Sequence, residues 1–187
     1  MTRWLTPDEQ RAWRSFLTAT QLLNAQLDRE LQRDSGIPHA YYEILVRLSE
    51  APDRVLRMSE LAQAAESSRS RLSHAVARLE DAGWVRRESC PTDRRGSFAR
   101  LTDDGFAALD AAAPAHVESV RRHLIDRLSP TQIAQLEQIS EAVVAGLRAD
   151  GDVGPEPAPS GRAGRAVADG GYRDALDEAC PEAPEAG

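Results

Sequence analysis

Side chains that could contact a polyanion gather on one predicted helix, residues 68–81. If Leu72, Val76 and Leu79 turn inward, with about 100° between successive residues, the opposite face carries hydroxyl, imidazole and guanidinium groups. The residues on or beside this face are Ser68, Arg69, Ser70, Arg71, Ser73, His74 and Arg78, around a small Ala77. Small side chains let a helix approach a duplex groove, where the polar groups can bind base edges and phosphates. The alternative is a solvated face that happens to lack acids.

A second polar cluster lies in "ESCPTDRRGSF", residues 88–98, between two strand-like runs, "WVRRES" and "SFARLT". Such runs separated by a glycine-containing loop predict a β-hairpin. Arg94 and Arg95 at its tip could enter a minor groove, whose negative potential attracts arginine. We expect Asp93 to pair with a nearby arginine and fix the shape of the loop.

Charge is distributed unevenly along the 187 residues, whose formal net charge is −7. Residues 54–100 hold 10 arginines and 6 acids, a balance of +4, while residues 150–187 hold 3 arginines and 9 acids, a balance of −6. A local basic face can attract phosphates even on an anionic protein.

Helices must position both clusters. "TPDE" predicts a capping box that starts a long helix at Thr6, which Gly36 and Pro38 should end near Ser35. Shorter helices should follow over about 40–50, from Ser59 and over 68–81, and then the hairpin. A helix from Thr102 towards Leu128, kinked or divided by Pro114, should lead to a last one that starts at "SPTQ", residues 129–132. The fold class is therefore mainly α with a β-hairpin wing, a winged helix-turn-helix.

Signatures of other classes are missing from the sequence. There is no phosphate-binding P-loop, dinucleotide fingerprint, HExxH, CxxC pair or nucleophile elbow. We therefore expect no enzyme, no catalytic residues, no cofactor and no metal. The N-terminus lacks the apolar segment of a secretory signal, and no apolar run approaches the ~20 residues of a membrane span. These features favour a cytoplasmic protein that does not contact a membrane.

The stretch "SRSRLSHAVARLEDAGWVRRESCPTDRRGSFARLTDDG", residues 68–105, resembles the MarR family of bacterial transcription regulators. The matching features are "RLEDAGWVRR", the wing "DRR" and "LTDDG", with "YYEILVRLSEAP" and "LRMSELA" upstream in the same order. The resemblance spans about residues 5–148. It implies a homodimer whose terminal helices interlock and a palindromic operator in double-stranded DNA, read by two copies of the 68–81 helix.

The resemblance also implies residue roles. Asp93 would organise the wing and Arg95 would be its minor-groove residue, while Ser70, Ser73, His74 and Arg78 occupy base- and phosphate-contacting positions. Many relatives carry a larger residue where Ala77 stands. Members are often released from DNA by small aromatic or phenolic ligands. The candidate ligand-binding residues are Trp13, Phe16, His39, Tyr42 and His116, with packing in the core or at an interface as the alternative for each.

These features give a domain prediction and a functional hypothesis. A MarR-like domain covers residues 1–149, with the winged helix-turn-helix at about 54–103 and a helical dimerisation region at 6–35 and 103–148. Residues 150–187 form a Gly/Pro-rich acidic tail predicted to be disordered. The leading hypothesis is a dimeric, sequence-specific repressor controlled by a ligand. The alternatives are a winged-helix module that binds protein, and a redox-responsive regulator acting through Cys90, whose arginine neighbours could lower the pKa of its thiol.

Overall fold

The computed structural model describes residues 1–65, 68–89 and 97–149. The predicted wing tip, with Cys90, Asp93, Arg94 and Arg95, and the predicted acidic tail lie outside the described residues. The chain divides into two compact units. The first comprises residues 1–39 and 112–137, and the second comprises residues 40–111 with the segment from 138 onward. Each unit is described separately below.

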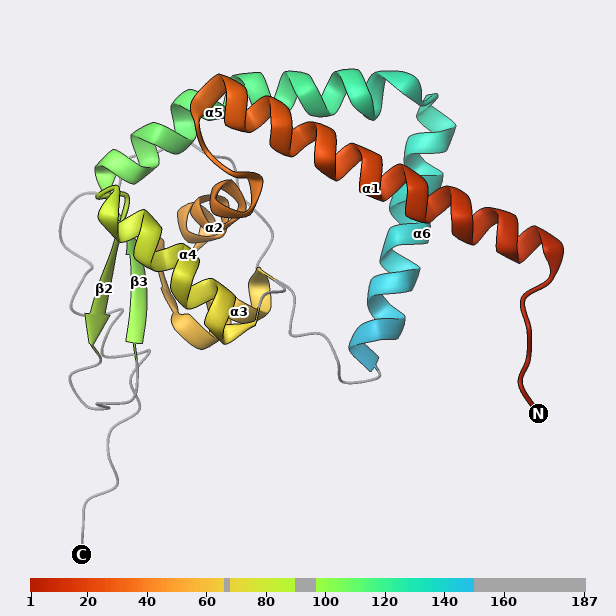
Figure 1. Cartoon of the computed structure of the whole chain (residues 1–187), viewed down its shortest axis with the longest axis horizontal. Helices are drawn as coiled ribbons and strands as arrows, with labels where there is room; N and C mark the ends of the chain where they lie inside the picture. Colours follow the sequence, from red (N-terminus) through yellow and green to blue (C-terminus); the bar gives the residue numbers. More distant parts are fainter. Residues whose placement is uncertain (66–67, 90–96, 150–187) are drawn as a thin grey trace, which may run out of the picture. The chain divides into compact units, whose positions relative to one another are not determined.

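The helix order matches the expected winged helix-turn-helix, whose elements are labelled in Figure 1. The helices are α1 (Pro7–Ser35), α2 (His39–Glu50), α3 (Met58–Ala64), α4 (Arg69–Asp81), α5 (Asp103–His123) and α6 (Pro130–Ala149). Short 3-10 turns occupy Pro52–Arg54 and Ile125–Arg127. The strands are β1 (Val55–Arg57), β2 (Val85–Ser89) and β3 (Ser97–Leu101).

Helix ends follow the capping signals of the sequence. The Thr6 N–H donates to the Glu9 carboxylate at 2.7 Å, and the Glu9 N–H donates back to the Thr6 hydroxyl at 3.3 Å, which confirms the capping box. Gly36 ends α1 at φ 71°, in the left-handed region that glycine tolerates. The same reciprocal bonds join Ser129 and Gln132 at the start of α6.

The sheet contains one strand that the sequence analysis missed. β3 lies between β1 and β2, with antiparallel pairing on both sides, so the predicted hairpin is the β2–β3 part of a three-stranded sheet. Val85 pairs with Leu101 and Ser89 with Ser97. Val55 pairs with Arg100. The hairpin is therefore anchored along its inner strand to the segment that immediately precedes α3.

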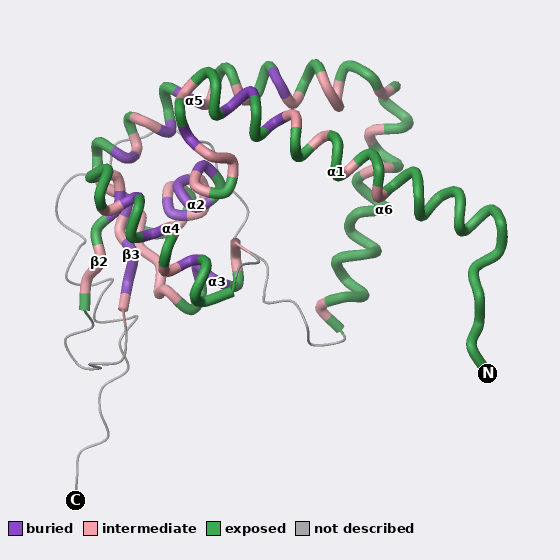
Figure 2. The backbone as a smooth tube through the Cα atoms, in the orientation of Figure 1, coloured by how far each residue is buried: buried purple, intermediate pink, exposed green. Residues whose placement is uncertain are grey.

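The core of the second unit is formed by side chains from α2, α3, α4 and the sheet (Figure 2). Its most deeply buried members are Leu45, Leu48, Leu61, Leu72, Val76, Leu79, Phe98 and Ala99. The inward face of α4, with Leu72, Val76 and Leu79, is thus the predicted one. The opposite face of α4 is exposed to solvent.

The expected end of α5 near Leu128 needs correction, and the helix is not divided at Pro114. α5 continues as one helix through Pro114 and ends at His123, before a short 3-10 turn. Proline removes one backbone donor, which would otherwise bind the carbonyl of Asp110. Both Asp110 and Pro114 are exposed, so that carbonyl can bind water and the helix is not divided.

Candidate nucleic-acid interface

The exposed face of α4 presents mostly short polar and basic side chains. Ser68 caps the helix, its hydroxyl accepting the Arg71 N–H at 3.3 Å. With Leu72, Val76 and Leu79 almost fully buried, the exposed residues of the helix before its last turn are Arg69, Ser70, Arg71, His74, Ala77 and Arg78. Periodicity predicted Ser70, Ser73, His74, Ala77 and Arg78 on this face, with Arg69 and Arg71 beside it, and all of these except Ser73 are exposed.

Arg78 forms a weak ion pair with Asp81. Its guanidinium lies 3.9 Å from the Asp81 carboxylate, and both side chains are about three-quarters exposed, at 73% and 74%. An exposed pair of this length contributes little energy. The guanidinium can therefore leave Asp81 for a phosphate at small cost.

Ser73 differs from its neighbours on α4 because it is half-buried. Its carbonyl accepts a hydrogen bond from Nη2 of Arg87 at 2.6 Å, and its hydroxyl lies 3.4 Å from the same nitrogen. The side chain thus stands at the border between the exposed face and the β2 strand. Sequence periodicity alone placed Ser73 on the outward arc and did not reveal this contact.

The base of the wing is held by a second arginine. Nε of Arg100 on β3 donates to Glu88 on β2 at 3.0 Å, and both side chains are largely buried, at 17% and 14% exposed. Nη1 of Arg100 also reaches the carbonyl of Asp53 at 3.1 Å. These bonds connect β2, β3 and the turn before β1, so they link the two strands of the hairpin to the segment that precedes β1.

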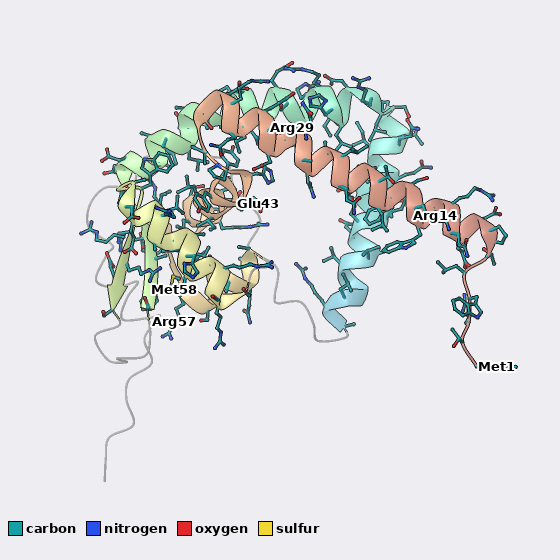
Figure 3. The ribbon with its side chains drawn as sticks, in the orientation of Figure 1. Met1, Arg14, Arg29, Glu43, Arg57 and Met58 are labelled. Atoms are coloured by element: carbon teal, nitrogen blue, oxygen red, sulfur yellow. The ribbon has the colours of Figure 1, made fainter. Side chains whose placement is uncertain are left out.

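Two further arginines, one on β1 and one just before it, lie over aromatic rings of β3 and α5. Arg57, labelled with Met58 in Figure 3, holds its guanidinium carbon 5.2 Å from the ring centroid of Phe98. Arg54 holds its guanidinium 4.0 Å from the Phe106 ring and pairs with Asp103 at 3.1 Å. Neither contact was apparent from the sequence, because the partners lie about 40–50 positions apart.

The candidate ligand-binding residues form two separate pairs. Trp13 and Phe16 stack on α1 with ring centroids 6.4 Å apart, and both are about half exposed. The ring centroids of His39 and His116 lie 5.5 Å apart. The His39 N–H donates to Asp28 of α1 at 2.9 Å. About 18 Å of helix separates Phe16 from Asp28, so the two pairs do not lie beside each other within one chain.

Burial changes the ionisation of two of these candidates. Burial raises the pKa of Tyr42, which is 7% exposed on α2. Burial, with a smaller contribution from the charge of His39, lowers the pKa of His116. Among the described residues, no three His, Cys, Asp or Glu side chains are grouped so that they could hold a metal ion. No helix in the described ranges is long and apolar enough to cross a membrane.

Comparison with known proteins decides the family. Sco3205, a MarR family transcriptional regulator from Streptomyces coelicolor solved in complex with DNA, is 53% identical, with a TM-score of 0.76. The match covers 86% of this chain and 96% of that chain. The chain belongs to the MarR family. The model of the MarR family itself matches residues 35–96 of this MarR-family chain.

Curated proteins similar to this MarR-family chain are also transcriptional regulators. HosA of Escherichia coli O111:H- is 35% identical over 116 residues, 62% of this chain and 84% of HosA. PecS of Dickeya dadantii (strain 3937) is 40% identical over 72 residues, 38% of this chain. The chain matches less than half of PecS, 41% of its length. The MarR-family fold and the exposed α4 face together make this face the candidate nucleic-acid interface.

Proposed function

We propose that this MarR-family regulator binds double-stranded DNA in a sequence-specific way, with α4 in the major groove and the wing alongside. The observation that carries the proposal is the exposed α4 face, which holds Ser70, His74 and Arg78 and no acid before its last turn. Similarity to Sco3205, which was solved in complex with DNA, supports DNA binding by this chain. Serine, histidine and arginine can all bind base edges or phosphates.

The roles within the interface follow from position. Arg69 and Arg71, with Ser68 at the cap, lie where the free N–H groups of the helix start favour a phosphate. Ser70, Ser73, His74 and Arg78 would meet base edges and nearby phosphates. Arg94 and Arg95 would enter the minor groove, and Asp93 would hold the wing in shape, as the resemblance implied. Residues 54–103 then form the DNA-binding part of a domain that spans 1–149.

We further propose that the regulator acts as a homodimer on a palindromic operator. Large apolar side chains stand uncovered in the chain near its N-terminus and on α6, none of whose residues is buried (Figure 2). They include Trp4, Leu5, Trp13, Phe16 and Leu22, and on α6 Ile139, Val143, Val144 and Leu147. Exposed apolar surface of this extent marks an interaction site. A two-fold dimer would present two α4 helices to two half-sites.

Control by a small ligand is the last part of the proposal. A repressor is released when a ligand prefers a conformation whose α4 spacing does not fit the operator. The His39–His116 pair of the first unit supplies ring nitrogens that can hydrogen-bond an aromatic acid or phenol. Tyr42 of the second unit is a separate candidate. Salicylate and unsubstituted benzene added separately to the complex provide the probe. Release by salicylate alone would support a site for aromatic acids.

Selection of bound duplexes from a random DNA pool, at two salt concentrations, tests the core of the proposal. We expect a palindrome with half-sites about one helical turn apart. Affinity for it should fall with salt, while the preference over random DNA remains. Recovery of no motif, with weak binding abolished by modest salt, would contradict sequence-specific binding and favour a protein-binding winged helix.

A further inference from the structure

Arg87 on β2 joins two separate points of α4. Its Nη2 donates to the Ser73 carbonyl at 2.6 Å, and its Nε lies 3.0 Å from Oε2 of Glu80. The other carboxylate oxygen of Glu80 accepts the backbone N–H of Arg87 at 2.9 Å. Both side chains are about two-thirds buried, at 33% and 32% exposed. One side chain on the strand thus contacts α4 at positions seven residues apart, about 10 Å along the helix axis.

Two anchor points on a helix limit more than its distance from the strand. Leu72, Val76 and Leu79 already pack α4 into the core. Two polar contacts two turns apart add to this packing a further restriction on the tilt and the rotation of the helix. Ser73 precedes His74, which stands on the exposed face, and Glu80 follows Arg78 by two residues. A change in the Arg87 contacts would therefore redirect the side chains proposed to meet the bases.

We propose that Arg87 is a positioning residue that sets the orientation of the exposed α4 face relative to the wing hairpin, and with it the sequence specificity of binding. This inference rests on the proposed DNA-binding function. Arg87 itself need not touch DNA: its guanidinium is already engaged with Ser73 and Glu80. The strand that carries it continues directly into the wing, so the same residue couples the two parts of the interface.

Lysine could not replace arginine in this role. The guanidinium is a planar fork whose nitrogens point in different directions, while lysine ends in one compact ammonium group. An ammonium could pair with Glu80 or approach the Ser73 carbonyl, but it could not hold both in this geometry. The neighbouring Arg86 provides a matched comparison. It carries the same charge on the same strand, lies on the other side by strand alternation, and is exposed.

The test compares Arg87→Lys with Arg86→Lys, both of which preserve charge. For each full-length protein, affinity is measured for the selected palindrome and for a scrambled duplex, over a series of salt concentrations. We expect Arg87→Lys to lower the ratio of specific to non-specific affinity by about tenfold or more, the effect of losing a good base contact. The salt dependence should stay that of the wild type, because no phosphate contact is lost. Arg86→Lys should leave the ratio unchanged.

Other outcomes separate the explanations. An unchanged ratio in Arg87→Lys, beside a wild type that discriminates, overturns this inference alone. A shallower salt dependence with an unchanged ratio would show a phosphate contact and overturn it too. A wild type that does not discriminate overturns the proposed function and this inference together. Equal weakening on both duplexes, with a lower melting temperature, would show a purely structural role.

Glu80→Gln carries the test if Arg87→Lys folds poorly. It removes the charge that faces Arg87 while keeping a side-chain oxygen to accept the backbone N–H. We expect it to lower the ratio at least about threefold, and the double variant Glu80→Gln/Arg87→Lys to behave like Arg87→Lys, because both changes disrupt one set of contacts. Additive losses in the double variant, or an unchanged ratio in Glu80→Gln, would overturn the inference.

Discussion

At the scale of single residues, His74 offers the most direct probe of the α4 face. It is exposed, and no acid stands on the helix before Glu80. We expect His74→Ala to weaken binding to the operator by about 1–3 kcal/mol, as loss of a base contact would, and to leave non-specific binding almost unchanged. Gln63→Ala, at an exposed position of α3, is the control. Equal affinity of wild type and His74→Ala in a direct titration would remove His74 from the interface.

Glu30 gives a residue-scale prediction in the other unit. It is 6% exposed on α1, where Nε2 of His123 lies 2.9 Å away and Nε2 of Gln26 donates at 2.6 Å. These bonds, that of His123 first, lower the pKa of Glu30 below its ordinary value of 4.5. The ionised form is therefore favoured in the folded state. Its stabilisation is present above about pH 4.5 and is lost as pH falls through the lowered pKa.

Urea unfolding between about pH 6 and pH 3 measures this effect. The wild type should lose more unfolding free energy on acidification than Glu30→Gln, which has no carboxylate to protonate. Glu137→Gln, which removes a carboxylate from an exposed position of α6, should follow the wild-type curve. If Glu30→Gln and wild type show the same dependence on pH, the Glu30 carboxylate does not contribute to acid sensitivity.

At the scale of elements, the sheet and the start of α5 approach each other closely in the second unit. Thr102 donates its hydroxyl to the Gly83 carbonyl at 2.8 Å and accepts the Gly105 N–H at 3.0 Å. A Cβ added to Gly105 would lie 2.1 Å from the carbonyl oxygen of Trp84. Backbone cannot yield as a flexible side chain does, so only glycine fits at position 105.

Gly105→Ala should therefore lower the free energy of unfolding by about 1–3 kcal/mol, the usual cost of overpacking. Gly146→Ala, also in a helix, is the matched control because its Cβ would have no atom within 4 Å. There, alanine should stabilise the helix by up to about 1 kcal/mol. Thermal melting of the two variants checks the opposite signs. A similar change in both would show that the approach of Gly105 to Trp84 is not retained in solution.

Sequence patterns predicted the elements that depend on local signals. The capping boxes at Thr6 and Ser129, and the spacing of Leu72, Val76 and Leu79, are written within one or two turns of helix. β1 was missed because three residues cannot show alternation, and its pairing with β3 depends on residues more than 40 positions away. The contact of Arg100 with the Asp53 carbonyl was missed for the same reason, because the two residues are 47 positions apart. Arg87 and Glu80 are seven residues apart, but only the packing of β2 on α4 shows that they meet.

For the candidate site, the sequence predicted which α4 side chains are exposed, but it did not predict their contacts with other elements. The periodicity that buries Leu72 and Val76 also exposes His74 and Arg78, so these side chains follow from sequence alone. Ser73 sits at the border of the two faces, where an angular estimate cannot decide burial. The ligand candidates were chosen as aromatic and imidazole residues without a spatial criterion. The structure separates Trp13 and Phe16 from His39 and His116 because about 18 Å of helix lies between Phe16 and Asp28.

At the scale of the whole molecule, the proposed homodimer explains two features together. It would cover the exposed apolar side chains of α6, and it would read the two half-sites of the proposed palindromic operator. Val143 is 52% exposed and Ile139 is 60% exposed on a helix with no buried residue. If a second copy covers them, a charge placed there would be buried without a partner. Val143→Glu should raise the dimer dissociation constant by about tenfold or more, measured by sedimentation over a range of concentrations.

Dimerisation and operator binding should then fail together. Val143→Glu should weaken binding to the palindrome far more than binding to a duplex with a single half-site, because each protomer keeps its own α4 and wing. Gln138→Glu adds the same charge on the opposite face of α6 and should change neither measurement. A Val143→Glu protein that stays dimeric would place the subunit contact elsewhere. If it became monomeric yet bound the palindrome as tightly as the wild type, two-fold reading of the operator would be wrong.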